Sequence, residues 1–267
     1  MVYFSFYFTT EEDGFPVLIT AEEPIFITEE PILVKEFLNM LMELVNLRTV
    51  STDIFGLKII KNGEYVKIRL PDGRNIQVSA GEFTKNVQHT IENIRRILQK
   101  RPVKVKHLKF RLLRPEEFWS EGDESYLNEY DIEIYGDVYV LNATINLRDY
   151  LDDLRGLKEF IEEGKLPKEK WRVVWDIAQL KQGLEKALPT LVKSADCVSP
   201  PFVRFNLGTY DPLEIVYVSN LGDRAALFFV AWAKIAIKVP KEVLLMALND
   251  AIRDAEKELE RLKLSGW

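Results

Sequence analysis

The clearest structural signal in this chain is the stretch LKIIKNGEYVKIRLPDGRNIQVS, which covers residues 57–79. Asn62-Gly63 separates two alternating runs, and both turn residues tolerate the positive φ that a two-residue hairpin needs. Pro71-Asp72-Gly73 then turns the chain a second time. The sequence therefore predicts a three-stranded antiparallel meander over residues 55–79.

Alternation within the meander assigns its side chains to two faces. The apolar set is predicted to point inward and consists of Leu57, Ile59, Val66, Ile68, Leu70, Ile76 and Val78. Lys58, Lys67 and Arg69 then fall on the other face. Ser79 leads into a predicted helix whose apolar stripe is Phe83, Val87, Ile91, Ile94 and Leu98.

Outside the meander, the patterns indicate an α+β protein with mainly antiparallel sheets. Strands are predicted near residues 2–8, 103–113, 129–147 and 213–239, the last including a run at 225–239. The strand at 103–113 changes phase near His107, which predicts a bulge. Helices are predicted at 28–48, at 147–163 before Gly164, at 167–193 with Trp171 and Trp175 on one face, and from Pro240 onward. A loop is expected at 194–212.

Length and composition allow one large domain or two smaller ones. The chain has 267 residues, and 47% of them are hydrophobic, so it can bury a substantial core. We expect an N-terminal α+β part, residues 1–147, whose centre at 54–114 is basic. A mostly helical part, residues 148–267, follows it, and the two parts could pack as one continuous domain.

The order of elements from Pro31 to Lys100 is helix, three antiparallel strands, helix, which is similar to that of double-stranded RNA-binding domains. The similarity concerns topology over about 70 residues. That family places a lysine-rich motif at the start of its second helix, whereas this chain has Gly81-Glu82-Phe83-Thr84-Lys85 with a single lysine. No binding residue is therefore assigned from the resemblance.

The formal net charge of -6 conceals blocks of opposite sign. Residues 1–53 hold 10 acids and 2 bases, 54–114 hold 15 bases and 4 acids, 115–164 hold 15 acids and 3 bases, and 165–267 hold 16 bases and 13 acids. The sharpest boundary lies at Pro115. Such segregation either builds complementary faces within the molecule or exposes a site for a polyanion.

The basic block 95–114 could bind nucleic acid, because lysine and arginine release counterions when they neutralise phosphates. Its candidate residues are Arg95, Arg96, Lys100, Arg101, Lys104, Lys106, Lys109 and Arg111. The meander cations Lys58, Lys61, Lys67, Arg69 and Arg74 would widen this footprint. The competing interpretation is internal: antiparallel pairing of 103–113 with 129–147 would set acids beside Lys109 and Arg111.

Several classes of function leave no signature in the sequence. A single cysteine, Cys197, excludes an intrachain disulfide framework. Neither a signal peptide nor an apolar run of roughly 18 residues is found, so we expect a cytoplasmic protein that does not bind membranes. Phosphate-binding loops, dinucleotide fingerprints and zinc-protease motifs are absent from the sequence, and no catalytic residue and no cofactor are assigned. Abundant lysine and glutamate resemble the composition of thermophile proteins.

A metal-dependent enzyme remains an alternative, because hard cations such as Mg²⁺ take oxygen ligands. The strand carboxylates Glu129, Asp131 and Glu133 would supply them, or the acids Glu116, Glu117, Glu121, Asp123 and Glu124. Their spacing fits no calcium loop, so no residue is assigned as a metal ligand. Cys197 would need His89 or His107 to act as a nucleophile, and neither histidine has a motif context.

The leading hypothesis is a non-catalytic interaction or assembly protein. Its final helix carries a coiled-coil-like seam of apolar residues spaced by three and four: Leu245, Leu248, Ile252, Ala255, Leu259 and Leu262. The segment 199–208 places Arg204 between two phenylalanines, which is typical of binding hot spots. The candidate interaction residues are Phe202, Arg204, Phe205, Leu248, Ile252, Leu259 and the terminal Trp267. We expect self-association or a protein partner, with nucleic acid as the alternative ligand.

Overall fold

The computed structural model confirms an α+β fold with mainly antiparallel sheets. It describes residues 3–9, 14–18, 24–26, 32–46, 51–54, 57–69, 73–99, 101–113, 129–136, 139–187, 199–206, 215–229 and 236–264. The chain forms two compact units, one of residues 1–99 with 137–139 and the other of residues 100–136 and 140–267. The structure thus divides near residue 100, whereas the sequence analysis placed a division after residue 147.

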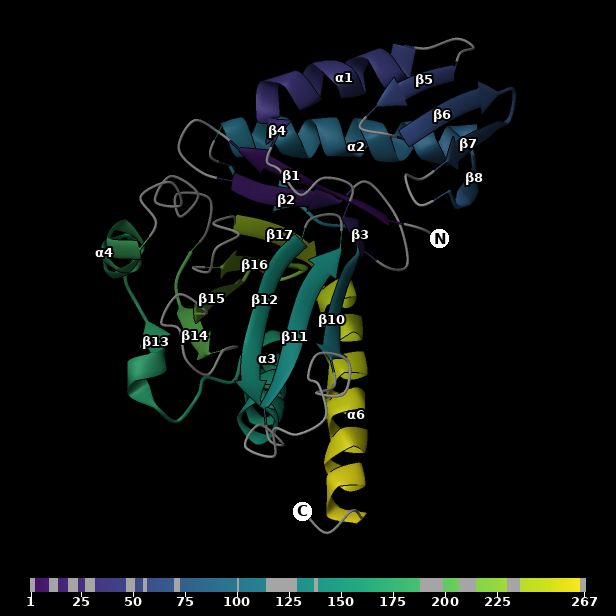
Figure 1. Ribbon diagram of the computed structural model, residues 1–267. Coiled ribbons are helices and arrows are strands. Elements are labelled where there is room, and N and C mark those ends of the chain that lie inside the picture. Colours follow the sequence, from purple (N-terminus) through teal and green to yellow (C-terminus); the bar gives the residue numbers. More distant parts are fainter. Residues whose placement is uncertain are drawn as a thin grey trace. The chain divides into compact units, whose positions relative to one another are not determined.

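The first unit begins with a small mixed sheet (Figure 1). Its strands are β1 (Tyr3–Thr9), β2 (Gly14–Leu18), β3 (Pro24–Phe26) and β4 (Ile32–Leu33). β2 pairs antiparallel with β1, and both β3 and β4 pair parallel with β1. The helix α1 (Val34–Asn46) follows directly and contacts β1 and β4.

The predicted meander is present, and it has one more strand than the sequence indicated. Its strands are β5 (Ser51–Ile54), β6 (Leu57–Asn62), β7 (Tyr65–Arg69) and β8 (Asn75–Ser79), paired antiparallel in that order. Gly63 and Gly73 take φ values of 58° and 87°, as turns with left-handed residues require. β5 was missed because its four residues are too few to show a pattern of alternation.

The inner face of the meander packs against α2 (Ala80–Leu98). Ile59, Val66 and Ile68 are buried, as are Val87, Ile91 and Ile94 on the helix. Ser79 caps α2 by accepting a hydrogen bond from the Glu82 amide at 3.1 Å. The predicted inward set and the predicted helix are therefore confirmed where the structure describes their side chains.

The second unit contains a three-stranded antiparallel sheet with the strand order β10-β11-β12. The strands are β10 (Leu108–Leu113), β11 (Glu129–Gly136) and β12 (Tyr139–Asn146). Phe110 lies opposite Ile134 and Leu112 opposite Ile132, and these positions belong to the inner face with Tyr130. The alternation predicted for residues 129–134 is thus confirmed.

A six-stranded sheet with the order β13-β14-β15-β16-β17-β9 completes the strands of this unit. Its members are β9 (Val103–Lys104), β13 (Val173–Val174), β14 (Phe202–Asn206), β15 (Ile215–Asn220), β16 (Arg224–Phe229) and β17 (Ala236–Pro240). Neighbours pair antiparallel except β17 with β9. Consecutive residues of β16 are buried, which indicates that both faces of its centre are covered.

Helices pack on these sheets. α3 (Leu147–Glu163) is capped by Asn146 and ends at Gly164 with φ 71°, as predicted. α6 (Lys241–Leu264) begins directly after Pro240, also as predicted, and contacts α3, β10, β16 and β17 (Figure 1). α4 (Ile177–Ala187) follows β13. Asn220 donates to the carbonyl oxygens of Phe160 and Ile161, both at 3.1 Å, and so satisfies free groups near the end of α3.

Four sequence predictions are corrected here. Residues 103–113 form two strands in two different sheets, because the chain leaves one sheet near His107 and enters the other. Residues 225–239 form two antiparallel strands, β16 and β17. The expected loop at 194–212 contains the strand β14.

The expected helix at 167–193 starts only at Ile177, after a 3-10 turn at Lys170–Arg172 and β13. Asp176 sets that start by accepting from the Ala178 amide at 2.8 Å.

Candidate functional site

Trp171 contacts two half-buried arginines beside β13, and a second exposed tryptophan, Trp175, follows that strand. Trp171 belongs to the 3-10 turn that leads into β13, Trp175 follows this strand, and Arg204 comes from the neighbouring strand β14. Trp171 exposes 58% of its surface and Trp175 exposes 62%. Large exposed indoles next to guanidinium groups are typical of binding hot spots. We call Trp171, Arg172, Trp175 and Arg204 the Trp–Arg surface.

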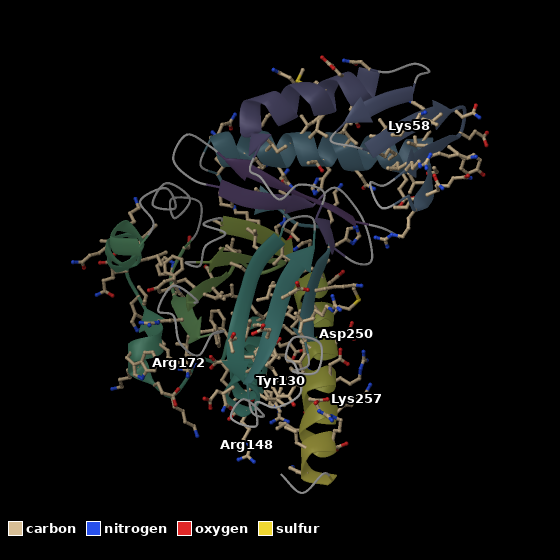
Figure 2. All side chains as sticks on the ribbon, in the orientation of Figure 1. Lys58, Tyr130, Arg148, Arg172, Asp250 and Lys257 are labelled. Carbon is tan, nitrogen blue, oxygen red and sulfur yellow. The ribbon has the colours of Figure 1, made fainter. Side chains whose placement is uncertain are left out.

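Arg172 anchors this surface to the rest of the unit (Figure 2). Its Nη1 donates to Oδ1 of Asp153, a buried carboxylate on α3. The same guanidinium lies 5.2 Å from the centroid of the Trp171 ring, within the range of a cation–π contact. Asp153 therefore holds Arg172, and Arg172 in turn holds the face of the Trp171 indole.

Arg204 approaches the same ring, with its guanidinium carbon 5.7 Å from the Trp171 centroid. Its Nε is buried without a hydrogen-bond partner. Within the described residues Arg204 forms no ion pair, and the residue opposite it on β15 is Tyr217. Arg204 therefore brings to this surface a positive charge that the described side chains do not neutralise, whereas the charge of Arg172 is matched by Asp153.

The backbone beside this cluster lies at the end of a sheet. β13 is the terminal strand in the described order and pairs only with β14 there. An edge strand presents unpaired N–H and C=O groups on its outer side. Within the described part of the chain, the Trp–Arg surface thus combines exposed aromatic area, one charge without an ion-pair partner and the terminal strand of a sheet.

Sequence reasoning missed Trp171, Arg172 and Trp175 as site residues. It placed both tryptophans on one face of a helix, because their spacing of four residues is also a helical spacing. The signal that could have prevented this error is Val173-Val174 between them, since adjacent β-branched residues favour a strand.

In the predicted interaction segment 199–208, the strand β14 points some side chains into the core and others toward the surface. Phe202 and Phe205 are fully buried in the core, so they anchor the strand and present no surface. Arg204 is half-buried and joins the Trp–Arg surface. Of the three residues predicted here, only Arg204 lies where a partner could reach it.

The predicted seam on the final helix is partly buried in the second unit. Of its six residues, Leu248 and Ala255 are buried, whereas Leu245, Ile252, Leu259 and Leu262 are half-buried. The helix also buries Leu244 and Ala251, which lie outside the predicted seam. The exposed side of α6 is mostly polar, with Asp250, Arg253 and Lys257, although Met246 is exposed. Trp267 lies outside the described residues. α6 therefore serves mainly as a core helix of its unit.

A buried polar network ties α6 to the sheet. The Tyr130 hydroxyl donates to Oε1 of Glu258 at 3.0 Å, and Arg261 donates to the same oxygen through Nε at 2.8 Å and Nη2 at 2.7 Å. Burial and the neighbouring Glu258 raise the pKa of Tyr130 to about 12, against the opposing charge of Arg261. Burial also raises the pKa of Tyr150 on α3. This network lies in the core, so we interpret it as structural.

The structure separates the residues of the basic block. Arg95 and Arg96 lie on the last turn of α2 in the first unit, where Arg96 pairs with Glu92 at 3.3 Å. Arg101, Lys104, Lys106, Lys109 and Arg111 belong to the second unit, and all five are exposed. Lys100 lies outside the described residues.

The sequence analysis predicted that acids of the strand at 129–147 would lie beside Lys109 and Arg111. The register of β10 and β11 confirms this for Arg111 and not for Lys109. Arg111 lies opposite Glu133 and pairs with it at 3.6 Å, as the antiparallel register predicted. Lys109 lies opposite Tyr135 instead of an acid. The acids of β11 therefore pair with only one of the two cations predicted to face them.

Two of the candidate metal-binding carboxylates, Asp131 and Glu133, have protein partners in the described part of the chain. Among these residues, no group of three or more histidine, cysteine or acidic side chains is arranged to hold a metal ion. Asp131 accepts a hydrogen bond from Thr144 at 2.6 Å, and Glu133 pairs with Arg111. Cys197 and the acids at 116–124 lie outside the described residues. Among the described helices, none combines the length and apolar character needed to cross a bilayer.

Comparison with protein-family models, with curated proteins and with solved structures gives no match to this chain.

Proposed function

We propose that this protein is a non-catalytic interaction protein that binds an acidic protein partner through the Trp–Arg surface. The observation that carries the proposal is the exposure of Trp171 and Trp175, with the Arg204 guanidinium over the Trp171 ring. Protein interfaces are enriched in tryptophan and arginine, and a few such residues supply most of the binding free energy.

The chemistry of the partner follows from the charges around the two indoles. Arg204 forms no ion pair with a described side chain, and the segment before Trp171 exposes Lys168 and Lys170 together with one acid, Glu169, while Asp176 is exposed after Trp175. A partner that presents a carboxylate to Arg204 and an apolar side chain to Trp175 would match this surface. The outer edge of β13, which is the terminal strand among those described, would accept an extended segment of that partner by strand addition.

The proposal moves the interaction role away from the final helix. Leu248 is already buried against the same unit, so a partner could not use it without displacing that packing. The Trp–Arg surface needs no such rearrangement, because its indoles are exposed in the folded chain.

Site-specific photo-crosslinking tests the proposal directly. A photoreactive phenylalanine analogue placed at Trp175 of the full chain should give discrete crosslinked products in a lysate of the native cells. The matched control is the same analogue at Met246, which is 63% exposed on α6. The products from position 175 should disappear when Trp171→Ala or Arg204→Glu is added.

Identical products from positions 175 and 246, or none from either, would contradict the proposal. The mass of the purified protein, measured by light scattering, identifies the case in which the partner is a second copy of this chain. In that case the oligomer should dissociate in Arg204→Glu and persist in Met246→Ala.

A further inference from the structure

The outward face of the meander is a second exposed surface with its own chemistry. The pairing register brings nine residues of β6, β7 and β8 to one face in three rows: Lys58, Arg69 and Asn75; Ile60, Lys67 and Gln77; Asn62, Tyr65 and Ser79. All nine are exposed. We call these nine residues the meander face.

Charge on the meander face has a single sign. It carries three cations and no acid, although the whole chain holds 42 acidic and 36 basic residues. The register also places Asp53 of β5 next to Lys58, at the edge of the first row. Among the residues whose side chains the structure describes, none forms an ion pair with Lys58, Lys67 or Arg69. The central rows of the sheet are therefore basic.

One pair on this face is unfavourable for folding. Lys58 and Arg69 lie directly opposite each other, and like charges at such positions destabilise a sheet. Asp53 lies across from Lys58 on its other side, but neither Lys67 nor Arg69 has an acid directly opposite it. A polyanion bound to the face would offset the repulsion between these cations.

Tyr65 adds a flat aromatic group to the cations. Its side chain is 50% exposed, and it shares β7 with Lys67 and Arg69, which follow at intervals of roughly 7 Å along the strand. Asn75 and Gln77 stand on the neighbouring strand and offer amide donors and acceptors. Ile59, Val66 and Ile68 fix the opposite side of the sheet in the core, so the face is a rigid platform.

From these features we infer that the meander face binds single-stranded nucleic acid. Lys58, Lys67 and Arg69 contact phosphates, and Tyr65 stacks on one base (Figure 2 labels Lys58 on this face). Single strands are the fitting form because a flat sheet can stack on splayed bases but cannot reach the base edges inside a duplex. The amides of Asn75 and Gln77 suit base edges better than they suit the carboxylates of an acidic protein.

Fluorescence anisotropy of the full-length protein with labelled oligonucleotides tests the inference. The probes are unstructured RNA and DNA single strands of about 16 nucleotides and the corresponding duplexes. Single strands should bind, and their affinity should fall steeply as salt rises from about 50 mM to about 200 mM. Absence of binding at the lower salt, equal affinity for the duplexes, or equally effective competition by polyglutamate would overturn the inference.

Variants of the face separate stacking from charge. Tyr65→Ala should weaken binding by about 5- to 150-fold, whereas Tyr65→Phe, which keeps the ring, should bind like the wild type. Lys67→Gln should reduce the slope of log affinity against log salt by about 0.7. The matched control is Lys85→Gln, which removes an exposed lysine from α2 outside this face and should not change affinity. Equal losses in Lys67→Gln and Lys85→Gln would show that the face is not the site.

Discussion

At the scale of single residues, Gly136 is required by a close approach of two backbone segments. A Cβ atom at this position would lie 1.8 Å from the carbonyl oxygen of His107 and 2.6 Å from its carbonyl carbon. Because both are backbone atoms, relief requires a shift of β10 against β11. We expect Gly136→Ala to lower the free energy of unfolding by at least about 2 kcal/mol, measured by urea denaturation.

Gly81→Ala is the matched control for this prediction. A Cβ at Gly81 meets nothing within 4 Å, and the residue lies in the first turn of α2. Alanine should therefore raise the free energy of unfolding by about 0.5 to 1 kcal/mol. Destabilisation by Gly81→Ala as large as that by Gly136→Ala would remove the steric explanation.

Tyr130 makes stability depend on alkaline pH. Burial and Glu258 raise its pKa in the folded state from 10.0 to about 12, so the unfolded chain loses this proton first. The stabilisation is complete below pH 10.0 and is lost as pH rises from there toward 12. We expect Tyr130→Phe to lower the free energy of unfolding by about 1.5 to 3 kcal/mol at neutral pH, because Glu258 loses a hydrogen bond.

The pH dependence is measured as a difference between the two proteins. Urea midpoints of wild type and Tyr130→Phe should differ fully at about pH 9 and should converge toward about pH 11. Tyr150 is present in both proteins, so its own raised pKa cancels in the difference. A constant difference across this range would assign the effect to packing alone.

Individual residues also show what the sequence could predict. The inward positions of the meander were correct, because alternation and turn residues are local signals. The exposure of Trp171 was not predicted, since it depends on Asp153, which is 18 positions earlier on α3 (153 to 171), and on Arg204, which is 33 positions later on β14. Local periodicity carries no information about such neighbours.

At the scale of elements, the apolar seam of α6 can be tested for two roles. It either packs in the core of its own unit or binds a partner helix. Leu248 is fully buried in its own unit. We therefore expect Leu248→Ala to lower the free energy of unfolding by about 2 to 5 kcal/mol, measured by urea denaturation. The mass in light scattering should stay unchanged.

Met246→Ala is the control on the same helix. Its side chain is exposed, so truncation should change stability by less than about 0.5 kcal/mol. If Leu248→Ala instead left stability intact and dissociated an oligomer, the helix would be an assembly seam, as its sequence alone suggested.

Other elements show where periodicity stops being informative. The stretch 103–113 reads as one strand with a change of phase, but it contributes to two sheets. Alternation identifies a strand and its two faces, whereas the choice of partner strand depends on segments such as β17, more than a hundred residues away. The phase change near His107 was a correct signal, and the bulge was a wrong interpretation of it.

At the scale of the whole molecule, the net charge of -6 does not oppose a local site for a polyanion. Exposed charges are screened over about 8 Å at physiological ionic strength, so a ligand on the meander face responds mainly to Lys58, Lys67 and Arg69 and to Asp53 at the edge of the face.

The sequence predicted the basic region but assigned most weight to residues 95–114. The structure distributes that block over two units and leaves three of the five meander cations, Lys58, Lys67 and Arg69, on one face.

The pairing of β9 with β17 also determines the order in which the chain can fold as it leaves the ribosome. The meander and α2 are complete once residue 99 has emerged, because all their partners are close in sequence. The second unit cannot be completed until its last strand and final helix have been synthesised, because Val103 pairs with Ile237 and Tyr130 binds Glu258 on that helix. Its early strands therefore stay without their final neighbours through more than a hundred further residues of synthesis, the interval in which a nascent chain is most exposed to chaperones and to aggregation.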